Sequence, residues 1–452
     1  MRRKKGEKMN RIFFCLVITQ VLYAQMLNAP LLYPFFEKLA HLEKNKDGKI
    51  NIVHVGDSHI QSEPFINAIR KPLQQQFGDG GRGFIFPYTL NKQVGMPYYF
   101  ATNAAWQTCR NSQPSKCAIG TEFGLSGYGF CTKTEPFVFS VEASEDKYKF
   151  NTIKVVSPIS SFYNIATVDM NMKPIIHKQK PSITLHRVKR GETLDLIAKK
   201  YNVFSATIKK ENKMRSNNIY VGKNLRIPIT VTETSVDTSI FRSLEYKSQE
   251  PLISVYHQDK PISTIYLLPT RKQSLYNLNG LVVEKDSPGL IYHSIGSIGA
   301  MASNYNETPL FFKQLPVLMP DLIIVSFGTN ESYSSISAEK YIEQIEQFIK
   351  NIRMFCHNVP IIITTPQISL LRNKKFNTYI LEYSNALVRK EDVAIWDLYS
   401  FLNRLMGPEK DIAATKISKD YVHYTGEGYI NQGTAFVQDF LNEYENYKRS
   451  RE

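Results

Sequence analysis

The stretch NIVHVGDSHIQSE, residues Asn51–Glu63, joins a predicted buried strand to a polar turn. The apolar run Ile50–Val55, which overlaps the start of this stretch, is typical of a strand buried on both faces of a parallel sheet. The turn Gly-Asp-Ser-His follows, and then the amphipathic segment Pro64–Phe77, which predicts a helix. Two interpretations of Ser58 follow. It is either the N-cap of that helix or a nucleophile placed where backbone N–H groups favour an oxyanion.

Strands and helices are predicted to alternate in the rest of this domain. Four further apolar runs of similar length follow at Leu290–Ser294, Leu322–Phe327, Pro360–Thr364 and Val393–Leu398. Ser337 is placed to cap a helix that ends near Phe355, and Thr425 to cap a closing helix. This alternation predicts a three-layer α/β domain, in which ligands bind at the carboxyl ends of the strands.

More than 200 residues separate the first predicted strand from the second. This interval is too long and too patterned to be a loop. Residues 135–157 and 251–269 carry aromatic and β-branched residues in short runs broken by turn residues, which predicts an inserted β-sandwich.

The insertion is itself interrupted by a strand–helix–helix–strand pattern from His186 to Pro228. The segments VKRGETLDLIAKKY and NNIYVGKNLRIP closely resemble the LysM module. The resemblance implies a βααβ fold that binds N-acetylglucosamine-containing glycans between two loops. Carried onto this chain, the binding residues are Gly191, Glu192, Thr193, Leu194, Asn218, Ile219 and Tyr220.

Charge and the N-terminus indicate an exported protein with a cell-wall partner. Residues 1–24 combine six basic residues with a short apolar run, which predicts a cleaved signal peptide. No later stretch is apolar enough for a membrane span. Residues 181–230 hold eleven Lys/Arg against three Asp/Glu. Peptidoglycan, whose peptides carry carboxylates, is therefore favoured over uncharged chitin, and nucleic acid is disfavoured. The expected location is the periplasm or cell envelope.

Four cysteines remain after the predicted cleavage: Cys109, Cys117, Cys131 and Cys356. Export permits oxidation, and the close spacing of the first three favours one disulfide among them, with the pairing left open. The chain has no Cys-x-x-Cys or His-Glu-x-x-His motif, so no metal site and no cofactor are predicted.

Polar residues also follow the other predicted strands. Gly299 offers a backbone N–H after the second strand, and Asn330 a side-chain amide after the third. Beyond the fifth strand, Asp420 precedes His423 by three residues, a spacing that lets a carboxylate orient an imidazole. A hydroxyl, a base, an orienting acid and amide donors together make an acyl-transfer site.

Four stretches are now in view: the Gly-Asp-Ser turn, the segment with Gly299, the segment with Asn330, and the segment with Asp420 and His423. In this order, they resemble the SGNH or GDSL hydrolase superfamily. The resemblance implies a flavodoxin-like, parallel five-stranded sheet, with Ser58 as nucleophile, His423 as base and Asp420 as orienting acid. It implies an oxyanion hole formed by the N–H of Ser58, Gly299 and Asn330. One departure is Ile298, where the family often has a polar residue before the glycine. His59, His54 and Asp57 are interpreted as a packed residue, a core residue and a turn-forming residue.

The inserted sandwich and the run FGDGGRGFIFP further resemble peptidoglycan O-acetylesterases. The expected function is removal of O-acetyl groups from peptidoglycan. The alternatives are esterase or acetyltransferase action on another polysaccharide, or a non-catalytic wall-binding scaffold. The sugar hydroxyl and the oligomeric state stay open. The expected organisation is a signal peptide (1–24), a hydrolase domain in two parts (25–90 and 290–452), a β-sandwich in two parts (91–180 and 231–289) and a LysM module (181–230).

Overall fold

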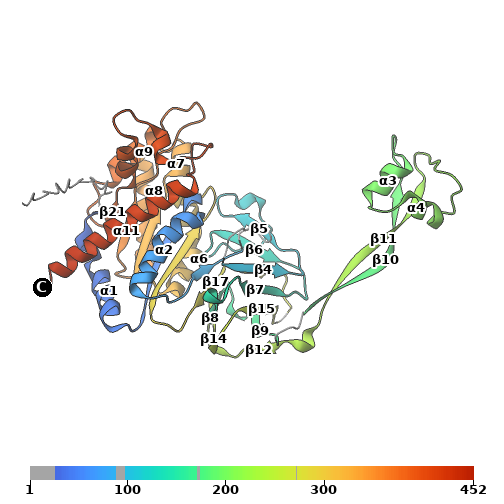
Figure 1. Ribbon diagram of the computed structural model, residues 1–452, viewed down its shortest axis with the longest axis horizontal. Coiled ribbons are helices and arrows are strands. Elements are labelled where there is room, and N and C mark those ends of the chain that lie inside the picture. The colour runs from blue at the N-terminus through green and yellow to red at the C-terminus, as the bar shows by residue number, and fades with distance from the viewer. Residues whose placement is uncertain (1–25, 88–96, 170–173, 271) are drawn as a thin grey trace, which may run out of the picture. The chain divides into compact units, whose positions relative to one another are not determined.

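The computed structural model describes residues 26–87, 97–169, 174–270 and 272–452 (Figure 1). The chain divides into two compact units, one of Met1–Gly83 with Ser287–Glu452 and one of Phe84–Asp286. The signal peptide expected over residues 1–24 lies outside the described residues. Within the described residues, every helix is too short or too polar to cross a bilayer.

A six-stranded sheet forms the centre of the first unit. The apolar runs predicted as strands all form strands, and these pair in parallel. A two-residue strand pairs antiparallel at one edge. Along the sheet, the order is β1 (Met26–Leu27), β21 (Ala394–Trp396), β20 (Ile361–Thr364), β19 (Leu322–Ser326), β2 (Lys49–Gly56) and β18 (Gly289–Gly296). Because the parallel strands point the same way, their carboxyl ends lie together along one side of the sheet.

Helices connect these strands, as the alternating pattern predicts. They are α1 (Tyr33–Asn45), α2 (Glu63–Phe77), α5 (Ala302–Asn306), α6 (Pro309–Gln314), α7 (Thr329–Tyr333), α8 (Ala338–Phe355), α9 (Thr378–Leu387), α10 (Leu398–Met406) and α11 (Gly426–Arg449). Ser337 caps α8 by accepting a hydrogen bond from the N–H of Lys340, and Thr425 caps α11 by accepting one from Gly428. Both predicted N-caps are therefore confirmed.

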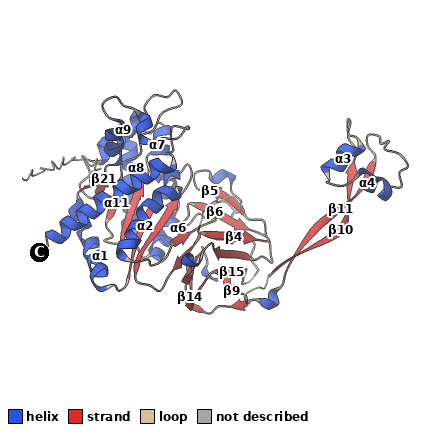
Figure 2. Ribbon diagram, viewed as in Figure 1, coloured by secondary structure: helices blue, strands red, loops and turns tan. Residues whose placement is uncertain are grey.

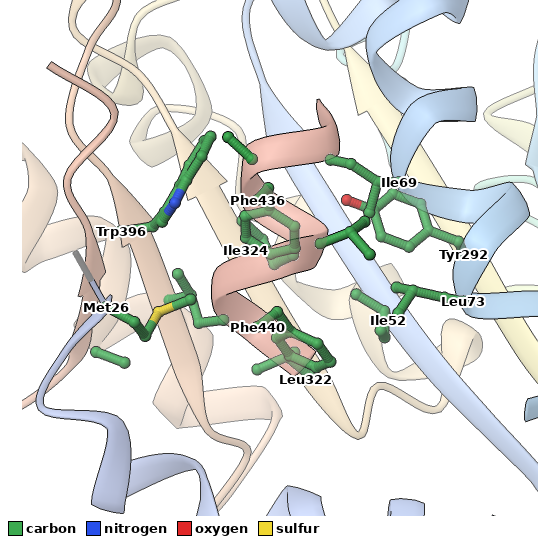
Figure 3. Close-up of a cluster of buried hydrophobic side chains, with 14 of the residues drawn as sticks. Met26, Ile52, Ile69, Leu73, Tyr292, Leu322, Ile324, Trp396, Phe436 and Phe440 are labelled. Atoms are coloured by element: carbon green, nitrogen blue, oxygen red, sulfur yellow. The ribbon is translucent and has the colours of Figure 1, made fainter. Parts of the chain in front are cut away.

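A large hydrophobic core lies between one face of this sheet and the helices α1, α2 and α11 (Figure 3). Alternate strand residues such as Ile52, Tyr292 and Ile324 point into it, because successive side chains of a strand face opposite sides. Phe436 and Phe440 of α11 pack against them. The intervening strand residues are also buried, which explains why these strands read as continuous apolar runs.

The second unit is built mainly of antiparallel sheets (Figure 2). One five-stranded sheet has the order β12 (Arg242–Ser243), β9 (Tyr163–Thr167), β15 (Thr264–Pro269), β7 (Phe139–Ala143) and β4 (Tyr98–Thr102). Another has the order β13 (Tyr246–Glu250), β14 (Ile253–Ile262), β8 (Phe150–Val156), β17 (Gly280–Glu284) and β3 (Gly83–Ile85). A three-stranded sheet contains β16 (Tyr276–Asn277), β6 (Tyr128–Thr132) and β5 (Gln107–Arg110).

The βααβ pattern predicted for the interruption is confirmed. Two long strands, β10 (Ile175–Arg187) and β11 (Asn224–Val236), pair antiparallel along all their residues. Between them lie α3 (Leu194–Lys200) and α4 (Ser205–Glu211). Leu194, Ile197 and Ala198 face inward, and they form a small core of their own with residues of α4 and β11.

A disulfide joins Cys109 to Cys117, with a Cα–Cα distance of 5.5 Å. One bond among the first three cysteines was predicted, and the fold determines which pair forms it. Cys131 and Cys356 are free thiols, and both are buried.

Candidate active site

The nucleophile turn follows directly after β2. Asp57 caps a short 3-10 helix, Ser58–Gln61, by accepting a hydrogen bond from the N–H of His59 at 2.9 Å. Gly56, at the end of β2, allows the close approach of β19, because a Cβ there would lie 2.3 Å from the carbonyl oxygen of Ser326. Ser58 therefore lies at the first position of the turn, with a partly exposed side chain.

Ser58, His423 and Asp420 form a continuous chain of hydrogen bonds. The Oγ of Ser58 lies 2.8 Å from Nε2 of His423. The Nδ1 of the same ring lies 2.7 Å from Oδ2 of Asp420. An ionised carboxylate only accepts, so Nδ1 carries the proton and Nε2 accepts from the serine hydroxyl. This is the arrangement in which an imidazole can take a proton from an attacking hydroxyl.

Asp420 is held as an anion by the turn that carries it. Its partial burial raises the pKa, but several hydrogen bonds outweigh this effect and leave the pKa well below its usual range. Its Oδ1 accepts from the hydroxyl of Ser418 and from the N–H groups of Val422 and His423. The carboxylate is thus fixed in orientation and ready to stabilise an imidazolium.

Two segments carry the expected amide donors, and they follow β18 and β19, the strands on either side of β2. Gly299 has a φ of 75°, a left-handed conformation that glycine adopts without steric cost. Asn330 lies in α7, and its side-chain amide donates to the carbonyl of Ala300 at 2.8 Å. This bond uses one of the two amide hydrogens, so the other stays available to a ligand. Ile298, beside Gly299, is 47 % exposed and presents an apolar side chain at this point.

Glu331 joins these two loops, a role that the sequence analysis missed. Its side chain is completely buried. One carboxyl oxygen accepts from the N–H of Ala302 at 2.9 Å, and the other from the N–H of Gly328 at 3.0 Å. Together with the bond from Asn330 to Ala300, these contacts fix the loops that present Gly299 and Asn330. The only sequence signal is an acid in the first turn of a short helix, which ordinarily indicates dipole stabilisation.

Burial raises the pKa of Glu331 to about 7, despite its two backbone N–H donors and with a further contribution from nearby Asp57. The folded protein therefore keeps the Glu331 carboxyl protonated between about pH 4 and 7, whereas the unfolded chain releases this proton. The contribution of the raised pKa to the free energy of unfolding is complete below pH 4 and is lost as the pH rises towards 7.

For Glu331→Gln, we expect the free energy of unfolding relative to wild type to change with pH. The stability of the wild type should fall, relative to the variant, by on the order of 3 kcal/mol between pH 4 and 7. Reversible urea unfolding at several pH values measures this difference, with the exposed Glu427→Gln as control. A difference that does not vary with pH would show that folding does not shift the pKa of Glu331.

The other histidines near the turn have structural partners. His59 is buried, its Nδ1 lies 2.9 Å from the hydroxyl of Tyr429, and its ring centre is 5.2 Å from that of His423. Burial lowers the pKa of His59 to about 3. His54 is also buried and contacts the hydroxyls of Tyr292 and Ser326. Both histidines therefore remain neutral, in agreement with their interpretation as packed residues.

The residues expected to bind glycan divide into two groups. Leu194 is buried in the core of the module and Ile219 packs against it. Thr193 caps α3, and Glu192 accepts hydrogen bonds from His186 and from the N–H of Lys189. These four side chains are engaged within the module itself. Gly191, Asn218 and Tyr220 form the second group, and all three are exposed, as Thr193 also is; Tyr220 is 69 % exposed.

Comparison with family models identifies two segments. Residues 275–436 match the GDSL-like Lipase/Acylhydrolase model, and residues 186–228 match the LysM domain model. Both resemblances inferred from the sequence are thereby confirmed. The GDSL match includes the strands β18 to β21 and the segment carrying Asp420 and His423. No curated protein sequence matches the chain.

Among solved structures, a peptidoglycan O-acetylesterase is similar over almost the whole chain. It is 16% identical, with a TM-score of 0.59, and the match covers 91% of this chain and 96% of that one. At this identity, the likeness shows a common fold. A lipase/acylhydrolase from Enterococcus faecalis is 20% identical, with a TM-score of 0.28, over 34% of this chain and 77% of its own. A carbohydrate esterase family 3 structure from Talaromyces cellulolyticus is 16% identical, with a TM-score of 0.27, over 35% of this chain and 73% of its own.

Proposed function

We propose that this chain, an esterase with a GDSL-type acylhydrolase domain and a LysM module, removes O-acetyl groups from peptidoglycan outside the cytoplasm. The observation that carries the proposal is the hydrogen-bonded chain from Ser58 through His423 to Asp420, in a protein that also carries a glycan-binding module. The order of the parallel strands supports a flavodoxin-like layout of the hydrolase domain. The presence of two five-stranded sheets in the second unit supports a β-sandwich insertion.

In the proposed reaction, the Oγ of Ser58 attacks the acetyl carbonyl carbon while Nε2 of His423 accepts the hydroxyl proton. The N–H of Ser58, the N–H of Gly299 and the amide of Asn330 stabilise the resulting oxyanion. The bond to the sugar oxygen then breaks, and His423 returns the proton to that oxygen. Water attacks the acetyl-enzyme with His423 again as base, which releases acetate and restores the Ser58 hydroxyl.

Three acetyl donors test the substrate class. Acetate release by the full chain is measured with O-acetylated peptidoglycan, with an O-acetylated neutral polysaccharide and with p-nitrophenyl acetate. The proposal predicts the highest kcat/KM per acetyl group with peptidoglycan among the polymers. Faster release from the neutral polysaccharide would assign the enzyme to a different wall or storage polymer.

The LysM module is proposed to hold the enzyme on insoluble glycan and so to raise the local substrate concentration. Lys180 and Val231 are register partners in the β10–β11 ribbon. Residues 181–230 can therefore be replaced by an Asn-Gly turn that closes the remaining hairpin.

This deletion is expected to slow acetate release from intact sacculi about 10-fold or more and to leave the rate with p-nitrophenyl acetate unchanged. The two assays are run in parallel on the same preparation. If both rates fell equally, the module would be required for folding or catalysis and not for tethering.

A further inference from the structure

A basic turn, Arg372–Lys375, follows β20 in the first unit. Its backbone is fixed by two hydrogen bonds, from the N–H of Leu371 to the carbonyl of Lys375 and from the N–H of Lys374 to the carbonyl of Leu371, both at 2.8 Å. An antiparallel bridge between Leu370 and Phe376 closes its base. The turn therefore presents its cationic side chains on a defined backbone.

Leu370, at the base of this basic turn, contacts two segments of the candidate active site. The N–H of Leu370 donates to the carbonyl of Tyr421 at 2.9 Å, and the hydroxyl of Tyr333 donates to the carbonyl of Leu370 at 2.6 Å. Tyr421 lies between Asp420 and His423 in the sequence, and Tyr333 ends the helix that carries Asn330. The Nζ of Lys374 lies over the Tyr421 ring, 5.7 Å from its centre. The cations thus lie at the edge of the site that contains His423.

These cations lack acidic partners. In the part of the chain that the structure describes, Arg372, Lys374 and Lys375 are exposed and form no ion pair, and the same is true of Lys419 next to Asp420. By contrast, Lys416 on the same segment pairs with Glu427 at 3.4 Å. Asp420 itself is engaged by His423 and Ser418. Against the single negative charge of Asp420, the four cations give this edge of the site a net positive charge, which attracts anions within about 10 Å.

We infer that the basic turn binds carboxylates that flank the acetyl ester on the substrate. This inference rests on the proposed function and extends it. A neutral acetylated glycan would gain nothing from three cations at this position, whereas the stem peptides of peptidoglycan carry carboxylates close to the sugar. Exposed charges of this kind mainly affect the encounter with the substrate and its salt dependence. The turn is thus a specificity element for peptide-bearing strands and takes no part in the chemical step.

Charge reversal tests the inference in the full chain. The test variant changes three residues of the basic turn, Arg372→Glu, Lys374→Glu and Lys375→Glu. The control variant makes the same change in net charge at three exposed cations on α1, the following turn and α2, namely Lys44→Glu, Lys46→Glu and Lys71→Glu. The substrates are soluble O-acetylated glycan strands with their stem peptides, the same strands after amidase removal of the peptides, and p-nitrophenyl acetate.

The test variant is expected to lose about 10-fold in kcat/KM with peptide-bearing strands at low salt, mostly through KM, and the loss should shrink at high salt. Its kcat/KM with stripped strands and with p-nitrophenyl acetate should match wild type, which also shows that it folds. The control variant should match wild type on all three substrates. Equal losses on intact and stripped strands, or no loss on either, would overturn the inference.

Two further outcomes separate the inference from the proposed function. If the wild type released acetate equally from intact and stripped strands, the carboxylate subsite would be refuted while the peptidoglycan esterase stood. If the wild type cleaved only p-nitrophenyl acetate and released no acetate from either kind of strand, the proposed function would fail, and stem peptides would be excluded as the anionic ligand.

Discussion

Replacing Ser58 with alanine is expected to lower kcat for p-nitrophenyl acetate about 10⁴- to 10⁶-fold. The Ser58 hydroxyl is the group that contacts Nε2 of His423, at 2.8 Å, and its removal leaves the base without a nucleophile to activate. The same substitution should abolish labelling by a fluorophosphonate. Because the Ser58 side chain is partly exposed, its loss leaves no large cavity, and the fold should be retained.

Ser62 provides a matched control in the same segment. It precedes α2, and its side chain makes no capping hydrogen bond. Ser62→Ala should therefore keep wild-type activity and labelling. Retention of activity by Ser58→Ala, with loss in Ser62→Ala, would move the nucleophile to the other end of the turn.

Replacing Asp420 with asparagine is expected to lower kcat about 10³- to 10⁴-fold while the protein remains folded. The asparagine oxygen can still accept from the N–H groups of Val422 and His423, as Oδ1 of Asp420 does at 3.0 and 2.9 Å. Its NH₂ group then faces Nδ1 of His423. The ring must adopt the tautomer protonated on Nε2, which cannot accept the proton of Ser58.

The steady-state rate with p-nitrophenyl acetate measures this effect, and circular dichroism checks the fold. Asp411→Asn is the control, because Asp411 also caps a turn on this segment, by accepting from the N–H of Ala413, and does not contact His423. A fall in kcat of less than about 10-fold for Asp420→Asn would mean that a different group orients the imidazole.

The strands and the helix caps of the first unit were predictable because their signals are local. Continuous apolar runs such as Leu322–Phe327 specify a doubly buried strand, and Ser337 and Thr425 specify helix starts without reference to the rest of the chain. The strand β1 was not predicted, since two residues give no periodicity. Its place at the edge of the sheet depends on pairing with Trp396 and Ile395, far away in the sequence.

The candidate active site was likewise predictable only where the sequence carries a local signal. Resemblance to known hydrolase blocks identified Ser58, Asp420 and His423, and the structure brings these three together. Glu331 was missed because its role depends on two N–H groups, one of them in another loop. The pairing of Cys109 with Cys117 likewise depends on the fold. Among the expected glycan contacts, Leu194 belongs to the core of the module, a role that its apolar character also fits.

The most direct test of the account is acetate release from O-acetylated peptidoglycan by the wild type and by Ser58→Ala, assayed side by side. We predict release by the wild type and none above background by the variant, with both proteins bound equally to the glycan through LysM. Equal release by the two proteins would contradict Ser58 as the nucleophile. Absence of release by a wild type that still cleaves p-nitrophenyl acetate would contradict peptidoglycan as the acetyl donor.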